Sequence, residues 1–339
     1  MNSDPHLLMK ISLTSRLRCP STGQSLHAQD LQGSLSASAD ELSDGWLVSQ
    51  DEEHRYPIRG GIPRFVPASN YADNFGMQWN KFSRTQLDSH SGHPITAERF
   101  WAATGWTPAD LKDRWVIDVG CGSGRFAEVA LGAGAHVVAL DYSSAVDAAA
   151  ANLRDHDRLY VVQGDIYALP FALASFDFVY SLGVLQHTPD VERAFMALPK
   201  MVKPGGALVV DFYRKSWRIA LLPKYWLRPI TKQLPKNTLF GVLERTVPLM
   251  LQISNALAAV PVLGRLLRRV VPVANYTGVL PLSKQQIREW ALLDTFDWLS
   301  PAYDNPQTPQ TVRRWLEAVG LQQVKVLHAG HLVGRGLMP

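Results

Sequence analysis

Cysteine is scarce in this sequence. Its 339 residues include only Cys19 and Cys121, which lie far apart and fit a reducing compartment better than a disulfide scaffold. We also expect no secretory signal at the N-terminus, because Lys10 interrupts its only apolar patch. We therefore expect a cytoplasmic protein.

Long apolar runs are absent as well. Residues 246–264 are uncharged for 19 positions, which is near the length that spans a bilayer. Two prolines and the polar residues Gln252, Ser254 and Asn255 interrupt the stretch. A transmembrane helix is not expected there.

Acidic residues are almost missing from residues 214–270. This segment contains eleven basic residues and one acid, Glu244, so it carries a charge of +10 while the remainder carries −6. The whole chain, at +4, is too weakly basic to indicate a nucleic-acid partner, and none is expected. The asymmetry indicates that the segment has a partner of its own.

The basic segment interleaves Trp217, Tyr225 and Trp226 with Arg and Lys, and later reads Leu266-Leu267-Arg268-Arg269. These patterns predict amphipathic helices. Such helices would contact an anionic membrane at its inner face or cover an apolar acceptor. A helical cap with a solvated basic face, or a homodimer contact, is the open alternative.

What the sequence does contain is an α/β pattern. Strand-like runs alternate with helical ones, at residues 115–119, 136–140, 159–163, 176–180 and 207–212. Thr308-Pro309 would then open a helix that Gly320 ends, before two last strands at 324–327 and 331–333. We expect four regions: a mainly-β domain (1–68), a helical lid or linker (69–112), an α/β domain (113–213 and 281–339) and a basic helical cap inserted after the fifth strand (214–280).

A glycine-rich turn follows the first strand of this α/β pattern. The run Asp118-Val119-Gly120-Cys121-Gly122-Ser123-Gly124 would bring a ligand against bare backbone at a helix N-terminus. Asp141 ends the next strand, where an acid can take both ribose hydroxyls. Gly164-Asp165-Ile166 ends the third, and Lys203-Pro204-Gly205-Gly206 turns into the fifth.

This succession resembles the class I S-adenosylmethionine-dependent methyltransferases of the small-molecule group, over residues 113–213 and 305–336. The resemblance implies a Rossmann-like, seven-stranded sheet whose last strand is antiparallel, with S-adenosyl-L-methionine as cofactor. It also implies that Gly120, Gly122 and Gly124 pass under the methionine part and that Asp118 binds its ammonium, directly or through water.

The same resemblance assigns the nucleoside end of the cofactor. Asp141 would hold the ribose with Tyr142 beside the adenine, Asp165 would meet the adenine amino group, and Ile166 would pack on the ring. Ser181, which ends the fourth strand, completes the cofactor-binding set. The aspartates could instead be helix-cap or turn residues. A nicotinamide-dependent oxidoreductase explains the glycines and Asp141 but not Asp165, and a non-catalytic nucleoside-binding domain stays open.

The front of the chain carries a second resemblance. Leu17-Arg18-Cys19-Pro20 and the later run Tyr56–Pro63 resemble a zinc-ribbon-like domain found fused to bacterial methyltransferases. Thr22 stands where the second cysteine would be and the later pair is missing, so we expect the fold without a metal. Its role would be docking or lid support, or stabilisation alone.

Residues 71–89 resemble the stretch that precedes the methyltransferase domain in a subset of bacterial enzymes. Helical spacing places Phe75, Trp79 and Phe82 on one side, which predicts core packing but leaves Gln78 unexplained. The preceding helix closes over the cofactor in related enzymes. Tyr71, Gln78 and Trp79 are therefore the expected acceptor wall.

Methyl transfer to a hydroxyl needs a base near the acceptor. His187, in the loop after the fourth strand, is the candidate; a structural histidine before the helix opened by Thr188-Pro189-Asp190 is the alternative. Tyr213, just past the fifth strand, is a further pocket candidate, as is Tyr303-Asp304. Oxygen is the preferred acceptor atom, on a small molecule, glycan precursor or lipid-linked intermediate.

Overall fold

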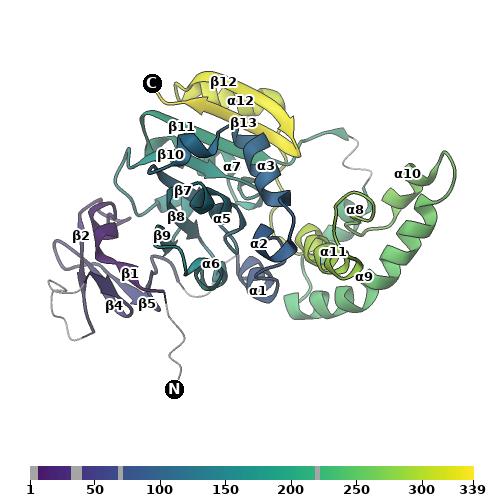
Figure 1. Cartoon of the computed structure of the whole chain (residues 1–339), viewed down its shortest axis with the longest axis horizontal. Helices are drawn as coiled ribbons and strands as arrows, with labels where there is room; N and C mark the ends of the chain where they lie inside the picture. Colours follow the sequence, from purple (N-terminus) through teal and green to yellow (C-terminus); the bar gives the residue numbers. More distant parts are fainter. Residues whose placement is uncertain (1–6, 32–39, 68–71, 218–221) are drawn as a thin grey trace.

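A seven-stranded mixed sheet forms the centre of the protein, as the computed structural model shows for residues 7–31, 40–67, 72–217 and 222–339 (Figure 1). The strand order is β12-β13-β11-β10-β7-β8-β9, and β13 runs antiparallel to both of its neighbours. This confirms the predicted fold class. The strands are β7 (Trp115–Val119), β8 (His136–Asp141), β9 (Leu159–Gln163), β10 (Phe176–Ser181), β11 (Val202–Phe212), β12 (Gln322–Ala329) and β13 (His331–Leu337).

Helices cover both faces of this sheet because its strand residues are apolar on both sides. Ile117 of β7 packs into one hydrophobic layer, together with α7 (Val191–Ala197) and α12 (Pro309–Ala318). Its neighbour Val116 packs into the opposite layer. The helices of that layer are α3 (Ile95–Thr104), α5 (Arg125–Gly132) and α6 (Ala145–Leu153). Successive strand residues point to opposite faces, so near-continuous apolar runs build both layers.

The N-terminal region is a small antiparallel sheet that packs against the large one. Its four strands are β2 (Leu26–Gln29), β4 (Gly45–Ser49), β5 (Arg55–Arg59) and β6 (Ile62–Pro63), and β1 (Met9–Lys10) pairs separately with β3 (Glu41–Leu42). The Phe65 backbone N–H donates to the Gln163 carbonyl at 2.8 Å, on the open edge of β9. Leu17 and Leu47 belong to the same hydrophobic cluster as Ile117. The region thereby covers a sheet edge that would otherwise be exposed.

Cys19 lies buried in this region, with its sulfur 3.2 Å from the Tyr56 hydroxyl. Within the four described stretches of chain, no group of three His, Cys, Asp or Glu side chains is placed to hold a metal ion.

Elemental analysis of the purified protein is expected to find no stoichiometric zinc. A structural zinc site needs four ligands, and Thr22 offers no thiolate beside Cys19. One equivalent of zinc that disappears in Cys19→Ser, but persists in the control Cys121→Ser, would contradict this prediction.

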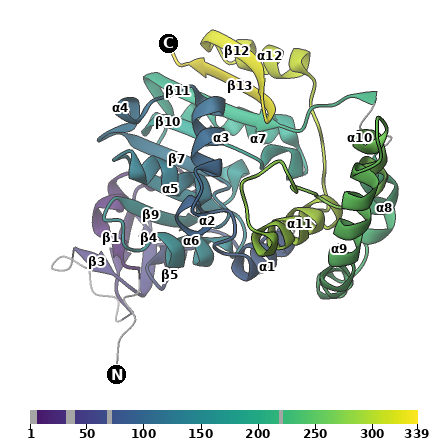
Figure 2. The same ribbon diagram turned by 45° about the vertical axis from the view of Figure 1, so that its right-hand side comes forward.

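The basic cap is a separate helical layer beside the sheet (Figure 2). It contains α8 (Pro223–Thr231), α9 (Lys236–Ala258) and α10 (Gly264–Leu267). The helix α11 (Lys284–Leu299) packs on α9, and Phe240 meets Phe296 there at 5.7 Å between ring centroids. Packing of the cap therefore continues beyond residue 280 to Leu299. No helix among the described residues is both long and apolar enough to cross a membrane.

The lid segment connects the cap to the sheet. It contains α1 (Asp73–Lys81), α2 (Asp88–Ser91), α3 and α4 (Pro108–Leu111). The Trp290 indole N–H of α11 donates to the Thr85 carbonyl at 2.8 Å, and the Gln286 side chain donates to the Ser91 carbonyl at 3.0 Å. These bonds hold α11 over the carboxyl ends of the strands.

Candidate active site

A cavity of about 540 Å³ lies at the carboxyl ends of β7, β8 and β10. The glycine-rich turn forms one part of its wall, while α1 and the cap helix α11 contribute other parts. Parallel strands gather their C-terminal loops at one edge of a sheet, where open α/β folds bind ligands. The volume is typical of small-molecule sites.

The turn after β7 needs glycine because its backbone is crowded and left-handed. Gly120 has φ +86°, and a side chain there would collide with Val184. Gly122 has φ +55°, and a Cβ atom would lie 3.0 Å from the Trp79 indole nitrogen. The bare backbone of Gly120 and Gly122 lines the cavity. Gly124 is not among the lining residues; Leu153 packs against it instead.

Asp141 lies at the end of β8 and faces the cavity. One carboxylate oxygen accepts the Gly122 N–H at 2.9 Å, and the other accepts both the N–H and the hydroxyl of Ser143, at 2.8 and 2.7 Å. Burial raises the pKa of Asp141, against the lowering effect of these donors. A carboxylate has about four lone-pair sites, so acceptor capacity remains for a ligand.

Asp118 lies behind the cavity wall rather than in it. Its side chain is 1% exposed, and one carboxyl oxygen has no hydrogen-bond partner among the described residues. Burial raises the pKa of Asp118 to about 8, which the nearby Tyr180 hydroxyl and the Arg125 guanidinium only partly offset. A buried carboxyl with no cation in direct contact is an environment that an incoming ammonium group would improve.

The lid helix α1 brings Gln78 and Trp79 to the cavity, with Trp79 covering Gly122. Gln78 is 1% exposed, and neither polar atom of its amide has a partner in the described structure. Buried amides are normally hydrogen-bonded, so this one points to a missing ligand. Tyr71 lies outside the described residues.

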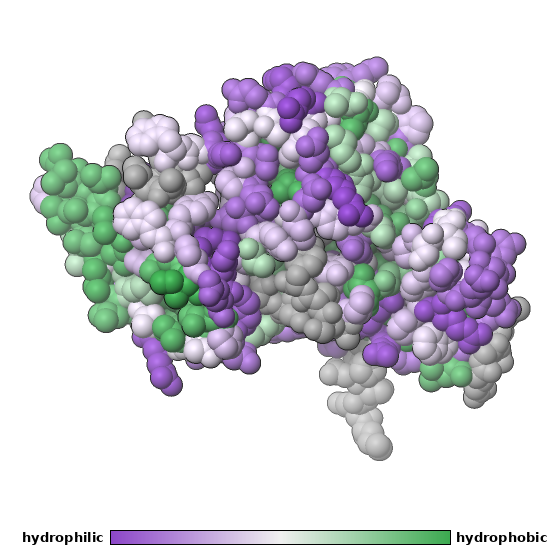
Figure 3. All heavy atoms as spheres, turned by 180° about the vertical axis from the view of Figure 1, so that it is seen from behind, coloured by the Kyte–Doolittle hydropathy of each residue, from purple (hydrophilic) through white to green (hydrophobic). Residues whose placement is uncertain are grey.

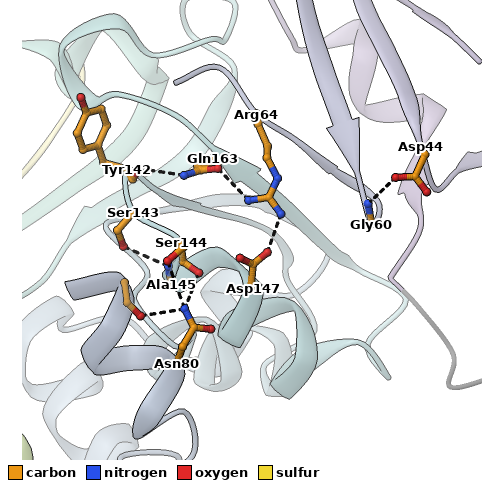
Figure 4. A network of polar contacts seen from close by, with 11 residues as sticks. Asp44, Gly60, Arg64, Asn80, Tyr142, Ser143, Ser144, Ala145, Asp147 and Gln163 are labelled. Carbon is orange, nitrogen blue, oxygen red and sulfur yellow. Dashed lines mark hydrogen bonds and ion pairs between the residues drawn. The ribbon is translucent and has the colours of Figure 1, made fainter. Parts of the chain in front are cut away.

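At the nucleoside end, Tyr142 and Ile166 line the cavity. The Tyr142 carbonyl accepts the Gln163 side chain at 3.2 Å, and Gln163 in turn accepts Arg64 of the N-terminal region at 2.9 Å (Figure 4). From the other side, Asn80 of α1 donates to the Ser144 carbonyl at 3.0 Å. The loop after Asp141 is thus held by both the N-terminal region and the lid.

Two expected cofactor residues, Asp165 and Ser181, make hydrogen bonds within the protein. Asp165 accepts the Tyr167 N–H at 2.9 Å and begins a short 3₁₀ turn, and Ser181 donates its hydroxyl to the Val119 carbonyl at 2.8 Å. Neither is among the residues that line the cavity. The Ser181 hydroxyl instead joins β10 to β7 inside the sheet.

His187 and Tyr213 meet at the other end of the cavity, with ring centroids 5.5 Å apart. The His187 ring is 7% exposed, and its Nδ1 lies 3.0 Å from the Tyr303 carbonyl oxygen. A carbonyl only accepts, so the neutral ring carries its proton on Nδ1 and leaves a lone pair on Nε2. Nε2 has no partner in the described structure.

The cap and α5 contribute charged groups that the sequence patterns did not predict. Asp294 and Asp297 line the cavity from α11, and Arg125 lines it from the first turn of α5. Asp294 accepts the Gln86 side chain at 3.1 Å and the Tyr276 hydroxyl, and burial raises its pKa to about 6. A sequence pattern could have indicated these two acids. They lie three residues apart in the mostly apolar second half of a helix, and this spacing places them on one face.

Comparison with known proteins agrees with this geometry. Residues 117–210 match the methyltransferase domain family. A tRNA U34 carboxymethyltransferase of Enterobacter sp. (strain 638) is 33% identical over 190 residues, which are 54% of this chain and 52% of that protein. A ubiquinone biosynthesis O-methyltransferase of Thiobacillus denitrificans is 32% identical over 136 residues, 39% of this chain and 58% of that protein.

The chain thus spans little more than half the length of these curated relatives. Among solved structures, an S-adenosyl-L-methionine-dependent methyltransferase of Methanococcus maripaludis, itself assigned only provisionally, aligns with a TM-score of 0.44 and 15% identity, over 80% of this chain and 96% of that one. The domain match covers the glycine-rich turn, Asp141 and His187. The chain carries a methyltransferase domain of the class I, S-adenosylmethionine-dependent family.

Proposed function

We propose that this protein transfers a methyl group from S-adenosyl-L-methionine to an oxygen atom of a small molecule, glycan precursor or lipid-linked intermediate. One observation carries the proposal. The unpartnered Nε2 atom of His187 lies in the same cavity as the bare turn Gly120–Gly122 and the carboxylate of Asp141. The residues that would bind the cofactor and the proposed general base thus line one cavity.

The residues present fit the cofactor. Gly120 and Gly122 offer bare backbone to the methionine part, Asp141 has free acceptor capacity for the ribose, and Ile166 offers an apolar surface to the adenine. Asp118 would meet the ammonium through water, because it lies behind the wall. Arg125, which also lines the cavity, offers a cation to the carboxylate.

When bound, the cofactor supplies an electrophilic methyl group on a sulfonium. The protein has to orient the acceptor oxygen, exclude water and remove a proton. His187 would remove that proton, because Nε2 can accept it from the hydroxyl while the Tyr303 carbonyl holds Nδ1–H. Trp79 and Gln78 close the cavity from the lid side.

A nicotinamide-dependent oxidoreductase does not account for the family match over residues 117–210. A non-catalytic nucleoside-binding domain does not explain why Nε2 of His187 lies in the cavity without a hydrogen-bond partner among the described residues. The Enterobacter relative makes a tRNA the competing acceptor class. The exposed apolar residues of the cap favour a small acceptor.

Methyl transfer itself tests the proposal. The protein is incubated with methyl-labelled S-adenosyl-L-methionine and either an organic extract of cells or total tRNA. We expect label in a small, organic-soluble methyl ether, and none in tRNA. Label found only in RNA, or S-adenosylhomocysteine binding without transfer to any fraction, would overturn the proposal.

We further propose that the end of the cap rests on an anionic membrane at its inner face. Large apolar side chains are exposed there, including Val262 at 99% and Leu266 at 64%. Figure 3 shows a hydrophobic surface at the end of the molecule that carries α10. We call residues 260–270 the apolar tip. Arg268 and Arg269 lie within this segment, so apolar burial and charge attraction would act together.

Sedimentation with vesicles tests this contact. Binding to phosphatidylglycerol vesicles should clearly exceed binding to phosphatidylcholine vesicles and should weaken as salt rises. Leu263→Ser together with Leu266→Ser should reduce binding without changing cofactor affinity, whereas Leu173→Ser, an exposed leucine far from the cap in sequence, should not. If the wild type ignores anionic vesicles at low salt and sediments as a dimer, the apolar tip is a subunit contact instead.

A further inference from the structure

The cap contains a second cavity, of about 470 Å³, which we call the cap cavity. It lies between the start of α8 and the segment that follows α10. Its described wall is apolar, with Val271, Val273, Val279 and Trp298, but it also contains Lys224, Arg268 and Arg269. No acid is found among the described residues that line it.

The cap cavity adjoins the active-site cavity. Lys224 and Trp298 belong to the walls of both. The Lys224 ammonium lies 5.0 Å from the centre of the Tyr213 ring, and that ring meets His187 at 5.5 Å. The wall that the two cavities share therefore lies next to the ring that contacts the proposed base.

The cations of the cap cavity have few protein partners. Lys224 is held over the rings of Tyr213, Tyr225 and Trp298. The charges of Asp304 and Asp297 also act on it, but no ion pair within 4.0 Å joins it to a carboxylate among the described residues. Arg268 donates to the Asn275 carbonyl at 2.8 Å, and Arg269 is exposed. A buried or half-buried cation without a close ion pair, such as Lys224 or Arg268, gains from an anionic ligand.

We propose that the cap cavity binds the anionic group and the adjoining apolar chain of an amphipathic acceptor, whose hydroxyl-bearing end then reaches His187. This inference rests on the proposed function, because it names the acceptor class of the same site. The anion would pair with Lys224, Arg268 and Arg269, and the chain would lie along Val271, Val279 and Trp298. The volume of the cap cavity is within the usual range for ligand pockets.

Calorimetry on the full chain with S-adenosylhomocysteine bound tests the inference without requiring turnover. The probes are decyl phosphate below its micelle concentration, decanol, inorganic phosphate and decyltrimethylammonium. We expect decyl phosphate to bind at least about tenfold more tightly than each of the others, since about 1.4 kcal/mol of added charge pairing corresponds to that factor. Equal binding of decyl phosphate and the cationic probe would overturn the proposal.

Variants separate the two halves of the site. The double variant Arg268→Gln/Arg269→Gln should bind decyl phosphate only as tightly as it binds decanol. The matched control Arg313→Gln/Arg314→Gln, on α12, should bind both probes like the wild type. Arg269→Gln alone changes an exposed residue and should also lower the affinity for decyl phosphate. Val279 is also exposed, and Val279→Trp should fill the cap cavity and lower the affinity for both decyl phosphate and decanol.

Two outcomes would reject the acceptor assignment. Decyl phosphate binding that survives all these variants would place the ligand elsewhere. Displacement of decyl phosphate by an equal concentration of short-chain phosphatidylglycerol would make the cap cavity a membrane-lipid site. If the wild type did not bind S-adenosylhomocysteine at all, the proposed function would be contradicted. Failure of the acceptor assignment and failure of the proposed function are therefore distinguishable.

Discussion

His187→Ala is expected to lower kcat by about 10²–10⁴ while leaving the affinity for S-adenosylhomocysteine nearly unchanged. The imidazole Nε2 is the unpartnered atom in the cavity, and Nδ1 is occupied by the Tyr303 carbonyl. Removing the ring removes the proton acceptor from the acceptor side, whereas Asp141 and the glycine turn remain. The measurements are turnover with the extract that supports wild-type activity, and calorimetry with the product nucleoside.

His187→Asn sharpens this test. An asparagine side chain retains an N–H donor for the Tyr303 carbonyl but provides no basic nitrogen. A structural role for His187 predicts that the asparagine variant recovers much of the activity; a base predicts that it stays as inactive as the alanine variant. His328→Ala, at an exposed histidine of β12, is the matched control and should be fully active.

Asp141→Ala is expected to weaken cofactor binding by roughly ten- to hundred-fold. Loss of charge-assisted hydrogen bonds to the ribose hydroxyls should cost about 1.5–3 kcal/mol. In the structure this carboxylate also accepts the Gly122 N–H at 2.9 Å, so its removal frees the turn that lies under the methionine part. Both effects act in the same direction, and calorimetry with S-adenosylhomocysteine measures their sum.

Asp141→Asn keeps one acceptor oxygen for Gly122 and should therefore bind more tightly than the alanine variant. Asp155→Ala, an exposed aspartate in the turn after α6, should bind like the wild type. Thermal unfolding of each variant checks that the fold is retained. A calorimetric response to NAD, with none to either sulfur nucleoside, would show that the cofactor assignment is wrong.

Sequence patterns came close to the observed strands because those patterns are local. Buried parallel strands appear as short apolar runs, and the predicted run at residues 115–119 is β7 as observed. The Thr308-Pro309 signal likewise opens α12, in which Thr308 accepts the Thr311 N–H at 3.1 Å. The β11 strand begins earlier than predicted, at Val202, because its pairing with β10 continues across the Pro-Gly-Gly turn.

By itself, the sequence determined the glycine-rich turn, Asp141 at the end of the second strand of the sheet, and the basic cap after the fifth. Each of these depends on neighbouring residues and on the order of elements along the chain. The tertiary structure decided which side chains share the cavity. Asp294 comes more than 150 positions after Asp141, and only the docking of α11 on Thr85 and Ser91 brings it there. Pairing of β10 with β7 likewise directs the Ser181 hydroxyl to the Val119 carbonyl inside the sheet. The apolar tip is exposed because no element remote in sequence covers it among the described residues.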